Sequence, residues 1–339
     1  MKANYNVFKP LSERSLILLA LISLLWGTSC SNDEDDENLG NWVERSVLDG
    51  TPRSSAAAFT INNLGYMGTG YDGDDYLGDF WVYDMDGNFW SQLANFPGVA
   101  RSSAVAFTVN GNGYVGTGFD GDNEVSDFYR YNTASNQWTQ IADFANGRVR
   151  RGAVAFNSES NGYVGTGFDG DNDLKDFWRY NPSSDTWEEL VGFGGNKRRD
   201  AATFTIGNSV YLGTGTSNGL GQTDFWVFDT TTETWSSLLD IDDDDDYTII
   251  RSNAVGFTIG DRGYFATGSG GAGTLRNVWE YNPATDLWEE KTSLEGVARE
   301  DAIAFCNGNR AFLALGRSGT LYLDDNREFF PLEEEDEDD

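Results

Sequence analysis

The sequence predicts an all-β protein in which six four-stranded repeats close into a ring, a six-bladed β-propeller. Three observations predict it. The 339 residues include 40 glycines, 6 prolines and 14% aromatic residues, a composition typical of short strands joined by tight turns. A triplet of the Gly-Thr-Gly type recurs at spacings of 48, 49, 48, 53 and 48 residues, and an arginine precedes a phenylalanine by six residues in every repeat. Repeats of this length suit propeller blades. The triplets begin at Gly68, Gly116, Gly165, Gly213, Ala266 and Ala314.

The second repeat illustrates the four strands expected in each blade. Residues 102–109 are small and apolar, as expected where first strands crowd around a central axis. A turn at 110–113 leads to a second strand at 114–118. An acidic loop then precedes a third strand at 127–131, and a further turn precedes a fourth strand that carries Trp138. The apolar faces of such a blade can be buried only by its neighbours, so the repeats must stack.

These residues resemble the Kelch repeat of the galactose oxidase central domain, with its glycine doublet, Asp-Gly loop, and nearby Tyr and Trp. A threonine replaces the first glycine of the doublet here. The resemblance implies a Kelch-like propeller across nearly all of the chain after residue 40. It implies little about function, because such propellers include enzymes, scaffolds and adhesins. The aromatic pairs, all seven residues apart, are Tyr83/Trp90, Tyr131/Trp138, Tyr180/Trp187, Phe228/Trp235 and Tyr281/Trp288.

Ring closure is predicted from the two ends of the repeat array. Trp42 stands eleven residues before Arg53, as Trp288 stands eleven before Arg299. We therefore expect the N-terminal segment near Trp42 to form the outer strand of the sixth blade and hide an edge. Residues 328–332 are the alternative, and both segments could contribute. The propeller is expected to span 41–332, followed by a disordered acidic tail at 333–339.

The N-terminus has the pattern of an export signal. Lys2, Lys9 and Arg14 precede an apolar run at 16–26, which is followed by Gly-Thr-Ser and Cys30. This order is typical of a secretory signal, and the run is shorter than the ~20 residues of a membrane span. Small residues before a cysteine resemble the lipobox of bacterial lipoproteins, which implies that 1–29 is removed and Cys30 is lipidated. An ordinary signal peptide with an incidental cysteine is the alternative.

Residues 30–40 are expected to form an acidic tether. A run of like charges is usually solvated, and directly after a lipidated cysteine it also resembles the export signal of surface-exposed Bacteroidetes lipoproteins. We therefore expect an outer membrane lipoprotein, exposed at the cell surface and attached to the membrane only by its lipid. A periplasm-facing anchor is the alternative.

Net charge and the absence of histidine exclude several functions. The formal charge is −32, with 23 basic and 55 acidic residues, so phosphate backbones are repelled and nucleic acid is not an expected partner. The chain has no histidine, which excludes histidine acid–base chemistry and the histidine-ligated copper of galactose oxidase. No catalytic constellation is recognisable, so we expect a protein that is not an enzyme.

Arginines are candidate ligand-binding residues. The loops before the first strand and between the second and third strands open on the same face of a blade. Arginines there could bind carboxylates bidentately. The alternative is a structural pairing with loop carboxylates, favoured because the set is regular, whereas two additional arginines break that regularity. The regular set is Arg53, Arg101, Arg150, Arg198, Arg251 and Arg299, and the additional pair is Arg151 and Arg199.

Acidic loops on the same face are candidate calcium sites. Their alternating aspartates present hard oxygen ligands, which Ca²⁺ prefers. The alternative is an ordinary solvated turn, and no other cofactor is expected. The candidates are Asp72, Asp74 and Asp79, then Asp120, Asp122 and Asp127, then Asp169, Asp171 and Asp176.

The sequence thus predicts a monomeric, non-enzymatic envelope module whose loop face binds an external glycan or protein. One enzyme family remains an alternative, because N-acetylneuraminate epimerases are similar six-bladed Kelch propellers of the Gram-negative envelope. That resemblance implies an arginine, such as Arg150 or Arg198, to hold the sugar carboxylate, and an acidic residue to move protons.

Overall fold

The structure is a computed structural model that describes residue 1 and residues 39–242, 244 and 247–336. The chain separates into two units, residues 1–37 and residues 38–339, and the second contains every strand described below. The predicted signal peptide, Cys30 and the acidic tether up to residue 38 lie outside the described residues. Within the described residues, no helix has the length and apolar character needed to span a membrane.

The six-bladed propeller is confirmed: the described residues form six four-stranded antiparallel sheets, whose first strands contact one another around the axis. Blade 1 has β2 (Ala57–Ile61), β3 (Leu64–Gly68), β4 (Phe80–Asp84) and β5 (Phe89–Gln92); blade 2 has β6 (Val105–Val109), β7 (Asn112–Gly116), β8 (Phe128–Asn132) and β9 (Gln137–Ile141); blade 3 has β10 (Val154–Asn157), β11 (Gly162–Gly165), β12 (Phe177–Asn181) and β13 (Thr186–Glu189). Blade 4 has β14 (Ala202–Ile206), β15 (Ser209–Gly213), β18 (Trp226–Asp229) and β19 (Thr234–Ser237); blade 5 has β20 (Val255–Ile259), β21 (Arg262–Ala266), β24 (Val278–Asn282) and β25 (Leu287–Lys291); blade 6 has β26 (Ile303–Cys306), β27 (Ala311–Ala314), β30 (Asn326–Phe330) and β1 (Asn41–Arg45).

Short elements decorate the loops between the second and third strands. In the described chain, blades 4, 5 and 6 each carry a two-stranded hairpin there, whereas blades 1, 2 and 3 have only isolated bridges. A single 3₁₀ turn follows blade 2. The hairpins are β16 (Thr216–Ser217) with β17 (Leu220–Gly221), β22 (Ser269–Gly270) with β23 (Gly273–Thr274), and β28 (Arg317–Ser318) with β29 (Leu321–Tyr322), and the turn is η1 (Phe144–Asn146).

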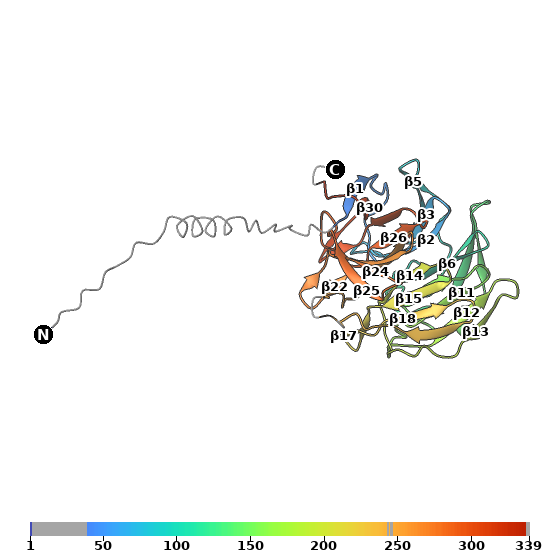
Figure 1. Cartoon of the computed structure of the whole chain (residues 1–339). Coiled ribbons are helices and arrows are strands. Elements are labelled where there is room, and N and C mark those ends of the chain that lie inside the picture. Colours follow the sequence, from blue (N-terminus) through green and yellow to red (C-terminus); the bar gives the residue numbers. More distant parts are fainter. Residues whose placement is uncertain (2–38, 243, 245–246, 337–339) are drawn as a thin grey trace. The chain divides into compact units, whose positions relative to one another are not determined.

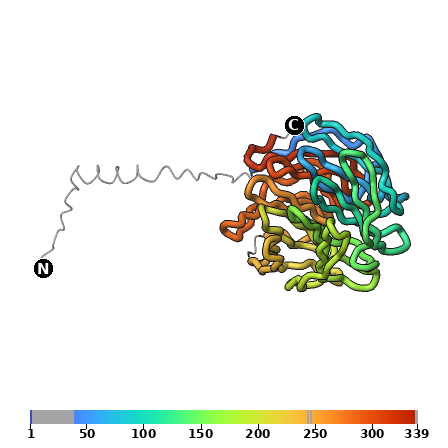
Figure 2. Tube along the Cα trace, turned by 90° about the vertical axis from the view of Figure 1, so that its right-hand side faces the viewer, coloured from blue at the N-terminus to red at the C-terminus, as the bar shows by residue number. Residues whose placement is uncertain are grey.

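Both ends of the array meet in blade 6. Strand β1 pairs antiparallel with β30, from Asn41 opposite Phe330 to Arg45 opposite Asn326, and β30 pairs with β27. The N-terminal strand is therefore the outermost strand, as predicted, and the C-terminal segment supplies the third strand. Figure 1 shows β1 beside β30, and in Figure 2 the chain passes around the ring until its blue and red ends are neighbours.

A closed belt of backbone hydrogen bonds surrounds the axis at one end of the first strands. The residue two positions after each arginine of the regular set donates its N–H to the carbonyl of its counterpart in the preceding blade, at 2.8–3.3 Å. All six have φ between 53° and 57°, a left-handed conformation that Asn, Asp and Gly tolerate best. The belt therefore links every blade to both of its neighbours through a backbone hydrogen bond. Its members are Ser55, Ser103, Gly152, Asp200, Asn253 and Asp301.

A second belt explains the final glycine of each triplet. Its N–H donates to the carbonyl of the arginine in the next blade at 2.7–2.9 Å, and Gly316 of blade 6 closes the circle on Arg53 of blade 1. These glycines have φ between 86° and 105°, and a Cβ would lie within 2.9 Å of a backbone oxygen. Only glycine fits that position.

Trp42 should therefore contribute strongly to the stability of the closed ring. Its side chain is 0% exposed, stacks on Phe329 with ring centroids 4.5 Å apart, and donates Nε1–H to the carbonyl of Thr292 at 3.4 Å. We expect Trp42→Ala to lower the free energy of unfolding by about 3–5 kcal/mol, measured by chemical denaturation. Phe89→Ala in β5, the outer strand of blade 1, is the control, because Phe89 is 50% exposed and its loss should cost under ~1 kcal/mol. Equal effects of the two substitutions would contradict closure by Trp42.

Candidate functional site

The candidate site lies at one end of the central channel. We call the face that carries the loops before the first strands, and between the second and third strands, the upper face. The first belt and the alanines beside it line the upper mouth of the channel, a cavity of about 120 Å³. Small side chains, such as Ala56, Ala104 and Ala153, line the axis, so the first strands can approach one another closely and the cavity stays small.

The six regular arginines are buried beneath this face. Each of these arginines is 0–1% exposed. Its Nη1 donates a hydrogen bond to the backbone carbonyl of the residue sixteen positions further on. In five blades the guanidinium also pairs with an aspartate 26 residues further on, as in Arg101, which reaches Asp127 at 2.6 and 2.8 Å. The predicted ring of ligand-binding arginines is therefore corrected: Arg53, Arg101, Arg150, Arg198, Arg251 and Arg299 face the interior, and five of them pair with Asp79, Asp127, Asp176, Asp224 and Asp325.

The carboxyl groups of Asp79 and Asp176 are held in the charged form by their arginines. Burial raises the pKa of the Asp79 carboxyl, but the hydrogen bonds and the charge of Arg53 outweigh it, so the pKa lies below its usual value. The same balance lowers the pKa of Asp176 beside Arg150. Removing one partner would leave an uncompensated buried charge, which typically costs about 3–5 kcal/mol.

Blade 5 departs from this arrangement. Arg251 has Asn277 where the other blades have aspartate, and its guanidinium donates only to backbone carbonyls, among them those of Thr267 and Asn277 at 3.0 and 3.1 Å. Burial without a carboxylate partner lowers the pKa of Arg251 to about 10. The regular arginines thus serve the fold even where their usual partner is replaced.

The acidic loops are compact turns. Asp72 accepts the N–H groups of Asp75 and Asp74 at 2.7 and 2.9 Å, and these hydrogen bonds lower its pKa. Asp120 and Asp169 repeat the turn. Asp74, Asp122 and Asp171 are exposed.

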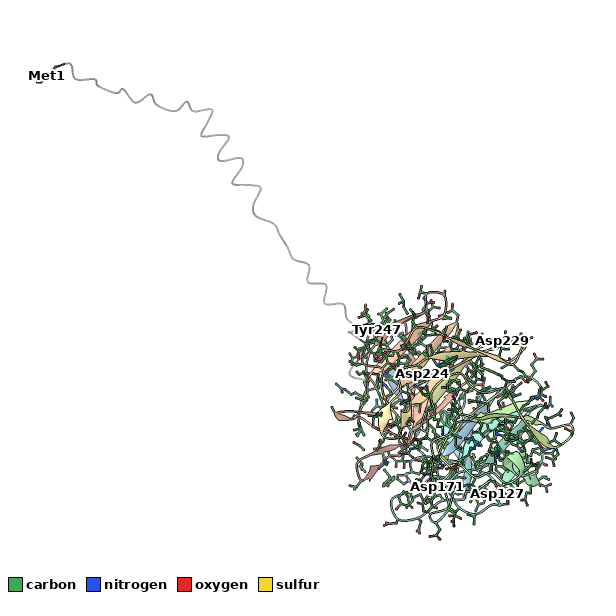
Figure 3. All side chains as sticks on the ribbon, turned by 90° about the horizontal axis from the view of Figure 1, so that it is seen from below. Met1, Asp127, Asp171, Asp224, Asp229 and Tyr247 are labelled. Carbon is green, nitrogen blue, oxygen red and sulfur yellow. The ribbon has the colours of Figure 1, made fainter. Side chains whose placement is uncertain are left out.

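The geometry does not support the calcium prediction. Asp79, Asp127 and Asp176 are held by arginines through both carboxylate oxygens. Figure 3 shows Asp127 and Asp171, from neighbouring blades, toward the same edge of the ring. Among the described residues, no three acidic or cysteine side chains come together as metal ligands.

Arg151 and Arg199, the two additional arginines, are partly accessible on blades 3 and 4. Their side chains are 36% and 29% exposed. The Arg151 guanidinium lies 4.5 Å from the Phe119 ring centroid and 5.4 Å from that of Phe168, and Arg199 lies 4.5 Å from Phe168. The four side chains alternate as a stack, which orders both guanidinium groups by cation–π attraction.

A tyrosine cluster extends this stack. Tyr71 lies 4.9 Å from Tyr76 and 6.0 Å from Tyr322 between ring centroids, and Tyr76 lies 5.9 Å from Phe119. All these rings are partly exposed. We call the whole set the aromatic–arginine arc: Tyr322, Tyr71, Tyr76, Phe119, Arg151, Phe168 and Arg199. The aromatic members of the arc were not predicted from the sequence, although Tyr71, Phe119 and Phe168 each directly follow a Gly-Thr-Gly triplet.

Two carboxylates, also missed in the sequence, stand at the upper mouth beside the arc. Burial, with the nearby charge of Asp301, raises the pKa of Asp200 to about 7, although Arg199 lies 3.7 Å away. Burial also raises the pKa of Asp301, against the opposing hydrogen bond from Arg317 at 3.0 Å. A carboxyl group that titrates near neutrality in a cleft marks a candidate functional residue.

Comparison with known proteins agrees with this architecture. The family model described as the Kelch motif matches residues 100–145 and 167–193. The chain is a six-bladed β-propeller that carries Kelch motifs over these residues. Among solved structures, "Structure of YjhT" matches with a TM-score of 0.71 and 18% sequence identity, over 83% of this chain and 96% of that one. At this identity the likeness shows the fold alone. No curated protein matches the sequence. A Kelch propeller is consistent with binding and protein-interaction roles.

The raised pKa of Asp200 predicts a pH-dependent stability. The folded pKa of about 7 exceeds the ~3.9 of an unfolded aspartate. The stability from holding this proton is therefore full below about pH 4 and is lost as the pH rises through 7. The side chain introduced by Asp200→Asn does not titrate. The free energy of unfolding of the wild type should therefore fall relative to that of the variant as the pH rises from 4 to 7. Denaturant titrations across this range, with Asp74→Asn as an exposed control, test this. A constant difference between Asp200→Asn and the wild type would contradict it.

Proposed function

We propose that this protein is a non-enzymatic cell-envelope lipoprotein whose aromatic–arginine arc binds an external partner. In this proposal, lipid on Cys30 anchors the chain at the cell surface, and the propeller presents its upper face outward. The carrying observation is the arc itself: partly exposed Tyr, Phe and Arg side chains gather beside the channel mouth.

The composition of the arc supports binding. Aromatic residues and arginine are enriched at the energetic centres of protein interfaces, whereas exposed lysine and glutamate are depleted. Arg151 and Arg199 are already ordered by stacking between rings, so a partner would immobilise fewer free rotamers on binding, which favours affinity.

The charge around the arc favours a basic partner. Asp74, Asp122 and Asp171 stand exposed on loops of the same face, and the chain carries a formal charge of −32. Such a field accelerates encounter with a positively charged surface and disfavours acidic ones. We therefore infer a partner protein with a basic patch, with a glycan as the alternative.

Replacing the two exposed arginines tests this proposal. Arg151→Ser and Arg199→Ser introduce the residue that blades 1, 2 and 5 carry at this position, in Ser54, Ser102 and Ser252, so the fold should tolerate both. We expect the double variant to capture its partner from detergent-solubilised outer membranes at least about tenfold less well, equivalent to ~1.4 kcal/mol. Arg262→Ser, which removes a partly exposed arginine from β21, is the control. Unchanged capture by the double variant would contradict binding at the arc.

A second candidate function is an N-acetylneuraminate epimerase-like sugar mutarotase. It is favoured by Asp200, whose pKa of about 7 suits a general acid–base group, beside Arg199, which could hold a sugar carboxylate.

Anomer exchange separates the two functions. On the non-enzymatic proposal, the purified propeller should not accelerate the exchange of freshly dissolved N-acetylneuraminate, followed by NMR. An acceleration that is lost in Asp200→Asn would overturn the non-enzymatic proposal and establish the mutarotase. Asp74→Asn controls for a change of charge on the same face.

A further inference from the structure

The turns between the third and fourth strands carry a repeated clip that joins neighbouring blades. In blade 2, Trp138 donates Nε1–H to the carbonyl of Ala94 in blade 1 at 2.8 Å, and Asn136 accepts the N–H of the same alanine at 2.9 Å. The hydroxyl of Tyr131 donates to Asn136 at 2.8 Å. The same three bonds join blade 6 to blade 1 and blade 2 to blade 3, through Tyr83, Asn88 and Trp90, and through Tyr180, Asp185 and Trp187.

The seam between blades 3 and 4 lacks this clip in the described structure. Trp235 Nε1 is buried and has no hydrogen-bond partner. Phe228 replaces the tyrosine, and Glu233 replaces the Asn or Asp. Val191, at the position of Ala94, is 92% exposed. A buried indole N–H without a partner costs about 1–3 kcal/mol, so this departure from the repeat is unfavourable for the fold alone.

Glu233 turns instead toward blade 3. Its carboxylate accepts the hydroxyl of Tyr163 at 2.8 Å and the Nη1 of Arg179 at 2.8 and 3.0 Å. Arg179 also pairs with Glu188. The side chains of Arg179 and Glu233 are 28% and 24% exposed, so both charged groups border solvent.

A cavity of about 490 Å³ opens at this pair. It lies on the face opposite the arc, between the turn at 158–161 of blade 3 and the turn at 230–232 of blade 4; Asp229, which precedes the second turn, is labelled in Figure 3. Serine, threonine and asparagine side chains supply most of the lining, including Ser158, Asn161 and Asn208. It is larger than the upper mouth and offers many donors and acceptors at short range.

The lining excludes several ligand classes. It offers almost no aliphatic surface, which disfavours lipids and aromatic compounds. Glu159 and Glu233 outnumber Arg179, and the chain is strongly acidic, so anions are repelled. No set of three metal-ligating side chains occurs among the described residues. What remains complementary is a neutral group with many hydroxyls, which can donate to carboxylate and amide oxygens and accept from arginine and threonine.

We propose that the cavity at the seam of blades 3 and 4 binds a neutral saccharide unit. The site is separate from the arc, so it goes beyond the proposed function and can stand or fall independently. Polar groups lining such a site bind a hydroxyl-bearing ligand and reject analogues that lack the hydroxyls.

A panel of neutral oligosaccharides tests the proposal, with maltotetraose, cellotetraose, xylotetraose, mannotetraose and chitotetraose as probes and trigalacturonate as the acidic counterpart. Binding is measured by calorimetry and by saturation-transfer NMR. We expect at least one neutral probe to bind and Thr231→Tyr, which fills the cavity, to weaken it at least tenfold. Ala134→Tyr places the same side chain at the matching exposed turn position of blade 2 and should leave binding unchanged.

A second variant guards against misfolding. Phe228→Tyr with Glu233→Asn restores the residues of the regular clip in blades 1 and 2; it should abolish binding while raising the thermal midpoint. Failure of every neutral probe to bind at about 10 mM, where a site with a Kd of ~1 mM would be mostly occupied, would overturn the proposal. Equal binding by Thr231→Tyr and Ala134→Tyr, or preference for trigalacturonate, would also overturn it. None of these outcomes bears on capture at the arc.

Discussion

The hydrogen bond from the last glycine of each triplet to the carbonyl of the next blade's buried arginine holds the ring together. It repeats at all six seams, and it requires two conditions. The glycine must adopt a conformation closed to other residues, and the arginine backbone must be fixed beneath the upper face. The second condition is met by the guanidinium group, which is held by a carbonyl of its own blade and, in every blade but the fifth, by an aspartate as well. The charge of one side chain thereby positions the backbone that its neighbour needs.

This dependence separates the regular residues from the irregular ones. A side chain that recurs in every blade satisfies a requirement that every seam has, so the buried arginines and the triplet glycines are explained by the ring. Arg151 and Arg199 stand where blades 1, 2 and 5 have serine, and Glu233 stands where blades 1, 2, 3 and 5 have asparagine or aspartate. The ring does not need them, and each lies at an exposed or hollowed part of the surface. We therefore expect binding functions to reside at these residues.

The register of the repeat was sufficient to predict the blade count and the closing strand, because Trp42 and Trp288 keep the same distance to an arginine. The pairing of Arg101 with Asp127 was also within reach, since the offset of 26 residues recurs in five blades. The arc was not predictable, because the contact of Arg199 with Phe168 joins adjacent blades and depends on the ring geometry. The raised pKa of Asp200 likewise depends on burial at an axis that a sequence pattern does not describe.

The composition of blade 6 has a kinetic consequence. Its outer strand comes from residues 41–45 and its inner three strands from the last forty residues. During synthesis, β1 emerges first yet has no partner until β30 is complete, so five blades can assemble around an axis that still has a gap. Pairing over so long a stretch of chain is slow. Until that final step, a strand with an apolar tryptophan stays available to any other open edge, so the interval before closure is the period in which this protein is most prone to associate wrongly.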